Sequence, residues 1–294
     1  MIHDIPYLID AFCSKIARRC SKKSCFTRNQ VVYRYVQRRF KRMALKYSSY
    51  AEASVTANTN NTIWVFWAQG RDHMPALVKQ CVEQIDRMKG EFRLVVLDTD
   101  SYKQYVTLPN IILLKLEEGK ITLTHFSDIL RFALLRKYGG WWMDATIFPV
   151  HPIDKQSSLY SIKTAYQPQY ISECKWSSFL WYMPAGHPMA CFLSEAWKKY
   201  WEKNDELVEY FLIDQLVKLF YDTSTSFCHE IDALPMENEY LYFMQSEESN
   251  LPFDEDKWKE ICNSTKFFKC NWRSEIKENT FRWQVLRRDP HLVS

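Results

Sequence analysis

Short apolar runs alternate with amphipathic segments from about residue 63 to residue 150, and this order is what most limits the possible folds. The runs predicted as buried strands are 63–67, 92–97, 141–143 and 146–150, with a possible further strand at 111–114. The predicted helices are 75–89 and 124–138, each followed by glycine, and then 189–203 and 205–221. A β-α-β-α-β order predicts an α/β fold with a mostly parallel central sheet flanked by helices. We expect one continuous domain over 63–294.

Glycine and cysteine usage exclude several common kinds of site. Only 6 of the 294 residues are glycine, and the chain contains neither G-x-G-x-x-G nor a G-x-x-x-x-G-K-[ST] phosphate loop. It also lacks G-x-S-x-G and H-E-x-x-H. The 9 cysteines form no C-x-x-C pair, so we expect reduced thiols rather than a zinc or thioredoxin-type site.

The N-terminal segment is strongly basic. Residues 1–50 carry 12 Lys and Arg against 2 acids, whereas the remaining 244 residues carry 27 against 33. A helix is predicted over 27–47, and its apolar stripe consists of Val32, Val36, Phe40, Met43 and Tyr47. Two interpretations remain open: a helix packed on the body with a solvated basic side, or a helix that lies on anionic lipid. Residues 51–62 are small and polar and are predicted as a linker.

We expect neither nucleic acid as a partner of the basic segment nor a membrane-spanning helix in the chain. No recognised nucleic-acid motif accompanies the charge, so nucleic acid is not an expected partner. No stretch approaches the roughly 18 apolar residues of a spanning helix, and no classical signal sequence is evident. We therefore expect a cytoplasmic protein.

Three charged residues between 124 and 148 are candidates for a functional site. Asp128 and Arg131 lie three residues apart, so they share one face of a predicted helix. Gly139 and Gly140 end that helix, and the next strand carries Asp144 at its carboxyl end. In open α/β sheets ligands bind beyond the carboxyl ends of the strands. A surface ion pair and a structural aspartate are the simpler alternatives.

The same block resembles a known signature. The segment S-D-I-L-R-(x)6-Y-G-G-W-W-M-D-A-T resembles the donor site of DXD-type glycosyltransferases that share a "sugar-binding region". It is most similar to the capsular polysaccharide synthesis protein family and more remotely resembles the clostridial glucosylating toxins. I-W-V-F-W-A-Q-G at 63–70 is similar to the first strand of that family, and Y-F-L-I-D at 210–214 to a later helix. The resemblance implies the GT-A fold and transfer of a sugar from a nucleotide-diphosphate donor, UDP-type above all, with retention of configuration.

The resemblance also implies roles for individual residues. Asp128 and Arg131 would hold hydroxyls of the donor sugar, and Asp144 matches the first acid of the DXD motif, so these three form the expected catalytic set. Trp67, Gln69 and Gly70 would border the base and ribose, although core packing is an equal alternative for Trp67.

The second acid of the motif is replaced by Thr146. Mn²⁺ or Mg²⁺ is still expected as cofactor, held by Asp144 with a weak contribution from Thr146, because these ions accept hard oxygen ligands. In K-F-F-K-C-N-W-R at 266–273, Lys269, Asn271 and Arg273 are candidates for binding the donor phosphates.

The expected activity is hexose transfer to a lipid-linked saccharide acceptor in bacterial surface or capsular polysaccharide synthesis. The enzyme would lie on the inner face of the cytoplasmic membrane, with residues 1–50 against anionic lipid. Two alternatives remain: a sugar-phosphate transferase, and a non-catalytic carbohydrate- or membrane-binding protein, which Thr146 favours. His125 and His187 are expected to be structural, and the aromatic residues in 181–188 either stack on acceptor sugar or belong to a core turn.

Overall fold

The computed structural model describes residues 25–49, 61–156, 158–273 and 276–287. Most of the predicted linker and the first 24 residues, including two of the three N-terminal cysteines, lie outside the described residues.

The central sheet has five strands in the order β2-β1-β3-β6-β5. Their bounds are β1 Thr62–Phe66, β2 Arg93–Leu97, β3 Gly140–Met143, β5 Tyr160–Ser161 and β6 Leu180–Met183. Strand β1 pairs parallel to both β2 and β3, and Trp64 lies opposite Val95 and Trp142. Strand β6 runs antiparallel to β3 and to β5, so four of the five strands point the same way. The predicted mostly parallel sheet is confirmed.

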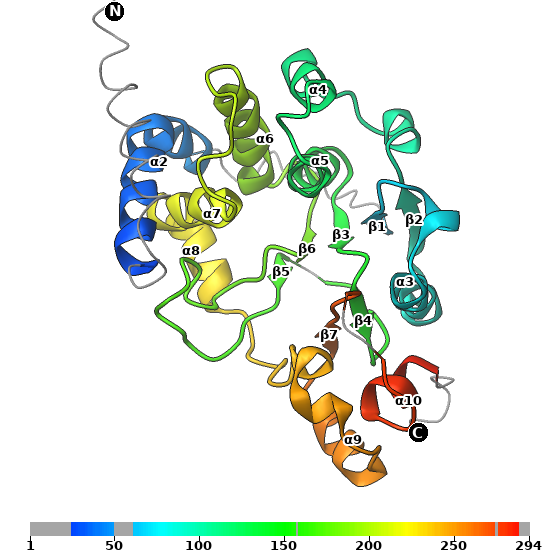
Figure 1. Ribbon diagram of the computed structural model, residues 1–294. Coiled ribbons are helices and arrows are strands. Elements are labelled where there is room, and N and C mark those ends of the chain that lie inside the picture. Colours follow the sequence, from blue (N-terminus) through cyan, green and yellow to red (C-terminus); the bar gives the residue numbers. More distant parts are fainter. Residues whose placement is uncertain (1–24, 50–60, 157, 274–275, 288–294) are drawn as a thin grey trace, which may run out of the picture.

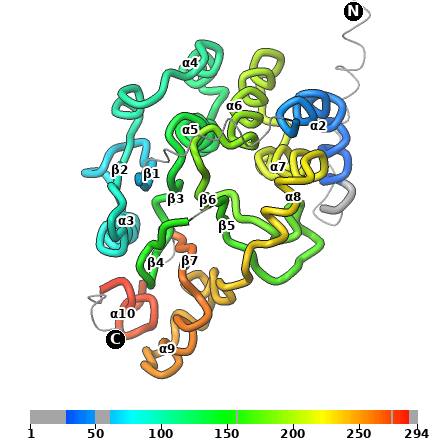
Figure 2. Tube along the Cα trace, turned by 180° about the vertical axis from the view of Figure 1, so that it is seen from behind, coloured from blue at the N-terminus to red at the C-terminus, as the bar shows by residue number. Residues whose placement is uncertain are grey.

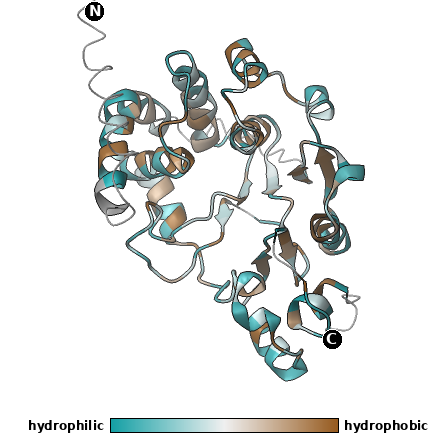
Figure 3. Cartoon of the chain, viewed as in Figure 1, coloured by the Kyte–Doolittle hydropathy of each residue, from teal (hydrophilic) through white to brown (hydrophobic). Residues whose placement is uncertain are grey.

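Helices cover both sides of this sheet, as predicted (Figures 1 and 2). Their bounds are α3 Ala76–Met88, α4 Asn110–Glu117, α5 Leu123–Tyr138, α6 Pro188–Trp201, α7 Leu212–Thr223 and α8 Thr225–Asp232. Short 3-10 turns lie at Arg71–His73, Ser101–Gln104, Phe243–Gln245 and Glu247–Asn250. In Figure 3, β1 and β2 of the central sheet are brown, while β3, β5 and β6 are pale because Trp, Tyr, Gly and Ser form most of them. Strands β1, β3 and β6 all contribute buried residues to the main core.

Two sequence predictions are wrong in detail. Residues 111–114 belong to α4 and not to a strand, because Ile112 is buried while Leu114 is 52% exposed, the one-sided pattern of a surface helix. The helix predicted from residue 205 begins at Leu212. The preceding segment is held as a loop by the hydroxyl of Tyr200, which donates to the carbonyl of Glu206 and accepts from the amide of Val208.

Helix α2 (Cys25–Ser48) confirms the predicted N-terminal helix. Val32, Val36 and Phe40 are buried in the same core as the sheet, and α2 packs against α6 and α7. Its basic residues Arg34, Arg38, Lys41 and Arg42 are exposed. No helix within the described residues is both long and apolar enough to cross a membrane. Contact between this helix and a membrane surface stays a prediction, as does the division into arm, linker and domain.

A second, smaller sheet joins distant parts of the chain. Strand β4 (Ile147–Pro149) pairs antiparallel with β7 (Phe267–Lys269), so Ile147 lies opposite Lys269. A second apolar cluster that includes Phe148, Trp258 and Phe281 packs this sheet against α9 (Glu255–Asn263) and α10 (Phe281–Arg287). The predicted strand at 146–150 therefore exists, but it pairs outside the central sheet. The pairing brings Lys269 beside the turn that follows Asp144.

Candidate functional site

The helix-glycine-strand unit places the three predicted charged residues together. Helix α5 begins at a cap in which the side chain of Thr122 accepts a hydrogen bond from the amide of His125 at 3.2 Å. It ends at Gly139, which has a φ of 64°. A Cβ atom there would lie 2.5 Å from the amide nitrogen of Ala185, so no larger residue fits. The chain then turns directly into β3, whose carboxyl end carries Asp144.

Arg131 connects the two carboxylates of the site. Its Nη2 atom lies 3.1 Å from Oδ1 of Asp128 and 3.1 Å from Oδ1 of Asp144. Its Nη1 atom donates to the carbonyl of Ser178, and its guanidinium lies 5.1 Å from the ring centroid of Trp142. The side chain of Arg131 is buried, so these contacts orient a charge that is screened from bulk water. Asp128, Arg131 and Asp144 therefore form one cluster, and the roles assigned to them from the sequence stay predictions.

Both oxygens of Asp144 are engaged. Oδ1 accepts from the indole nitrogen of Trp142 at 3.0 Å as well as from Arg131, and Oδ2 accepts from Nζ of Lys269 at 2.9 Å. Burial alone would raise the pKa of Asp144, but the charges of Lys269 and Arg131 outweigh it and hold that pKa below its ordinary value. Asp144 is therefore a carboxylate at neutral pH.

Of Lys269, Asn271 and Arg273, the three residues considered for binding the donor phosphates, only Lys269 has a recorded contact with Asp144. Its amide donates to the carbonyl of Leu241 at 2.8 Å, and its carbonyl accepts from Nε2 of Gln245 at 2.7 Å. Its Nζ atom lies 4.6 Å from the ring centroid of Phe179. Asn271 and Arg273 are exposed, and the guanidinium of Arg273 stacks on Trp272 at 5.0 Å.

The carboxyl end of β1 lies at the same edge of the central sheet as Asp144, because β1 and β3 are parallel. The amide of Trp67 donates to the carbonyl of Leu97 at 2.8 Å, and its ring meets Trp272 edge to face at 6.1 Å. Gly70 has a φ of 81°, so the turn after the strand adopts a conformation that favours glycine, and Gln69 is exposed. The half-buried Trp67 thus links the first strand to the segment after Lys269.

Sequence reasoning assigned no role to two further residues beside the cluster. Asp214 on α7 is 8% exposed, and its Oδ1 atom accepts from the indole nitrogen of Trp176 at 2.9 Å. Burial raises the pKa of Asp214 to about 7, with a further contribution from the charge of Asp128. Tyr210 is 62% exposed, and partial burial of its hydroxyl together with the charges of Asp128 and Asp144 raises its pKa. Both lie in Y-F-L-I-D at 210–214, which the sequence comparison related only to a later helix of the family.

The residues present do not fit a ready-made divalent cation site. Among the described residues, no group of three or more His, Cys, Asp or Glu side chains could hold a metal ion. Asp144 is already bound to two cationic side chains. Thr146 lies in the turn between β3 and β4, and its carbonyl accepts a hydrogen bond from the amide of Cys270 at 2.9 Å. The expected Mn²⁺ or Mg²⁺ therefore stays a prediction.

The two histidines and the aromatic residues of 181–188 belong to the fold. Nε2 of His125 accepts from the indole nitrogen of Trp201 at 3.0 Å, and Nδ1 of His187 accepts from the amide of Met189 at the start of α6. Trp181 and Tyr182 are buried in β6, so core packing is the correct alternative for them.

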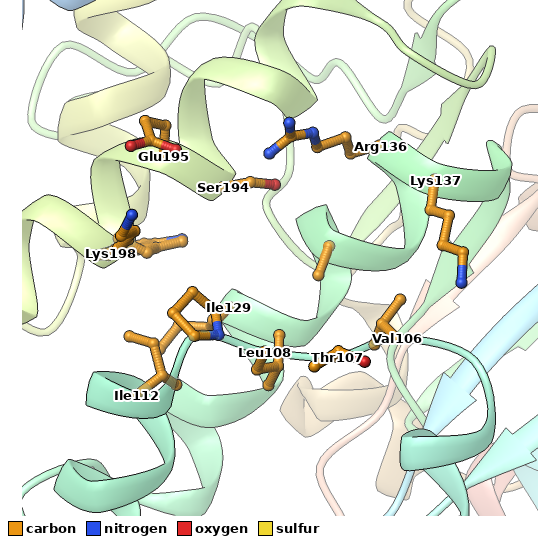
Figure 4. Close-up of a pocket in the computed structure, with 13 residues that line it drawn as sticks. Val106, Thr107, Leu108, Ile112, Ile129, Arg136, Lys137, Ser194, Glu195 and Lys198 are labelled. Carbon is orange, nitrogen blue, oxygen red and sulfur yellow. The ribbon is translucent and has the colours of Figure 1, made fainter.

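A separate cavity of about 350 Å³ lies between α4, α5 and α6 (Figure 4). Its apolar lining includes Leu108, Ile112 and Ile129, and Arg136 and Lys198 also border it. It uses a different side of α5 from Asp128 and Arg131, neither of which lines it. This cavity is not the site described above.

Comparisons with known proteins give a family that matches most of the chain and two proteins that are similar to parts of it. The family described as "Capsular polysaccharide synthesis protein" matches residues 14–285. The O-glycosyltransferase PaGT of Phomopsis amygdali is 30% identical over 105 residues, which span 33% of this chain and 26% of that protein. Among solved structures, the one described as "PaToxG Glycosyltransferase" aligns over 70% of this chain and 83% of that chain, with a TM-score of 0.41 and 13% identity.

Proposed function

The chain belongs to the capsular polysaccharide synthesis protein family, and from this premise we propose that it transfers a hexose-type sugar from a nucleotide-diphosphate donor to a saccharide. The observation that carries the proposal is the charged cluster at the carboxyl end of β3, where Asp128, Arg131, Asp144 and Lys269 meet. Ligands of α/β folds bind at this edge of the sheet. We assign the GT-A fold to the chain on the same grounds.

Within the cluster, Asp128 and Arg131 hold the donor sugar, and Asp144 lies on the side that faces the diphosphate. Oδ1 of Asp128 is held by Arg131, while its Oδ2 atom lies 3.7 Å from Nδ1 of His125, beyond hydrogen-bonding distance. Asp128 accepts a hydrogen bond from a donor-sugar hydroxyl, and Arg131 fixes the position of that carboxylate. Orientation of the anomeric carbon in this way lowers the barrier to transfer. Retention of configuration needs no dedicated base, and we assign none.

The donor nucleotide extends toward the end of β1. Trp67, Gln69 and Gly70 follow that strand, and the edge-to-face contact of Trp67 with Trp272 provides an aromatic boundary for the base. A UDP-type donor would place its base and ribose here and its diphosphate toward Asp144.

The acceptor side is formed by exposed aromatic residues. Tyr210 and Tyr242 are 62% and 53% exposed, and the ring of Tyr242 lies 6.5 Å from that of Phe179, on which Lys269 packs. Aromatic rings present apolar faces that can cover a sugar ring. We assign this side to a lipid-linked saccharide.

The exposed basic face of α2 would hold the enzyme on the inner face of the cytoplasmic membrane.

One panel tests the proposal against its alternatives. The protein is incubated with UDP-, GDP- and TDP-sugars, with and without Mn²⁺, and release of the nucleoside diphosphate is measured together with thermal stability. A donor at a hundred times its dissociation constant should stabilise the fold by about 2.7 kcal/mol. Incorporation of phosphate instead of sugar into the acceptor would identify a sugar-phosphate transferase. Stabilisation by a saccharide without turnover of any donor would identify a non-catalytic binder.

A further inference from the structure

We propose that Lys269 is the built-in cation of the donor site: it binds the donor diphosphate and makes a divalent cation unnecessary. The inference rests on the proposed function, since it assigns the charge that the leaving nucleoside diphosphate requires. It is carried by the contact between Nζ of Lys269 and Oδ2 of Asp144 at 2.9 Å.

The charge balance of the cluster supports this role. Asp128 and Asp144 carry two negative charges, and Arg131 and Lys269 carry two positive ones. A divalent cation bound at Asp144 would lie within a few ångströms of a partly buried ammonium group and would be repelled by it. It would also have to displace the hydrogen bonds that Asp144 already accepts.

The residue at position 146 agrees with this charge balance. Thr146 stands where the DXD signature places its second acid, so one negative charge is missing from the turn after β3. The carbonyl of Thr146 accepts a hydrogen bond from the amide of Cys270, which directly follows Lys269. The turn after β3 thus carries a neutral side chain at Thr146 and lies beside the ammonium group of Lys269. This combination favours an anion over a divalent cation.

The ammonium group is held in place before any ligand binds. Lys269 is anchored by the β4–β7 pairing and by the bonds of its backbone to Leu241 and Gln245. Its side chain is 18% exposed and passes over the ring of Phe179. A charge that is oriented in a partly dry site stabilises developing negative charge with little reorganisation.

In the transfer step, the bond between the anomeric carbon and the β-phosphate oxygen breaks, and its electron pair stays on the nucleoside diphosphate. The oxygen of the acceptor hydroxyl bonds to the anomeric carbon, and its proton passes to the departing phosphate. Lys269 remains an ammonium throughout and stabilises the additional negative charge on the diphosphate.

The test measures binding of UDP and GDP by calorimetry in EDTA and in Mn²⁺. We expect wild-type protein to bind one of them in EDTA with an affinity within about threefold of that in Mn²⁺. Lys269→Met should weaken binding in EDTA by about tenfold or more, the effect of losing a charge-assisted hydrogen bond, and Lys269→Arg should retain most of it. The matched control is Lys266→Met, because Lys266 lies on the same segment and pairs with Glu237 at 2.9 Å; its affinity should not change.

Asp144→Asn gives an independent readout. Removal of the carboxylate releases Lys269, so UDP or GDP binding in EDTA should be kept or tightened even though transfer is lost. If Asp144 instead holds a metal, this variant should lose a Mn²⁺-dependent gain in affinity. Wild-type binding that requires Mn²⁺, or a Lys269→Met variant that binds as tightly as wild type in EDTA, overturns the inference and leaves the proposed function standing. Absence of UDP and GDP binding in both buffers overturns the two together.

Discussion

Replacing Asp214 with asparagine should make the protein more stable at alkaline pH. The carboxyl of Asp214 is buried against Trp176, and burial raises its pKa from the ordinary value of 3.8 to about 7. Between these two pH values the folded state binds a proton that the unfolded state has released. The free energy of unfolding of the wild-type protein therefore falls as the pH rises through this window.

The size of the effect follows from the shift. A difference of about three pKa units, at about 1.36 kcal/mol per unit, corresponds to about 4 kcal/mol once the pH exceeds 7. Asparagine keeps an oxygen for the indole of Trp176 but carries no charge at any pH. The variant should therefore resemble wild type near pH 4 and exceed its stability by up to about 4 kcal/mol at pH 8.

Urea unfolding at pH 5 and pH 8 measures this difference. Between those two values the gain of Asp214→Asn over wild type should grow by about 3 kcal/mol. Asp72→Asn, which changes an exposed acid in the turn after β1, is the matched control and should show no such growth. A gain that changes by less than about 1 kcal/mol would show that Asp214 does not retain its proton in the folded protein.

Three further predictions follow from the described contacts. Asp144→Asn should lower transfer by about 10²–10³-fold while circular dichroism and melting show an intact fold, and more than a tenth of wild-type activity would contradict its role. Arg131→Lys cannot reach all three of its partners and should cost about 3 kcal/mol of stability, or about 6–12 °C in Tm, whereas exposed Arg136→Lys should stay within about 0.5 kcal/mol. Combined substitution of Arg34 and Arg42 by Gln should weaken sedimentation with anionic liposomes at low salt, and unchanged sedimentation would assign membrane contact to other residues.

The N-terminal substitutions are preferable to a deletion of residues 1–50. Val36 and Phe40 of α2 are buried in the main core, and Ala44 also lies there without exposure. Deletion would uncover this apolar surface and is expected to destabilise the fold itself. Substitution of exposed arginines changes the charge of the same helix and leaves its packing in place.

Local sequence patterns were sufficient to predict structure wherever the interacting residues lie close together in the chain. Helix α5, its glycine end and strand β3 were predicted from apolar spacing and from Gly139-Gly140. Asp128, Arg131 and Asp144 all lie in this one unit of helix and strand, so their meeting followed from the order of the elements. A short apolar run gave the wrong element at 111–114, because four residues cannot distinguish a strand from one side of a helix.

The α/β architecture, the candidate residues Asp128, Arg131 and Asp144, and the family resemblance could all be predicted from the sequence, because each depends on periodicity or on a contiguous motif. Tertiary structure alone decided that Lys269, 125 residues after Asp144, contacts it at 2.9 Å, because the pairing of β4 with β7 depends on which distant strands meet. It also raises the pKa of Asp214 through burial against Trp176, which no local pattern specifies. Charge balance at a site is set by groups that are neighbours in space, and proximity in space between distant segments is a property of the packed chain and not of any one segment.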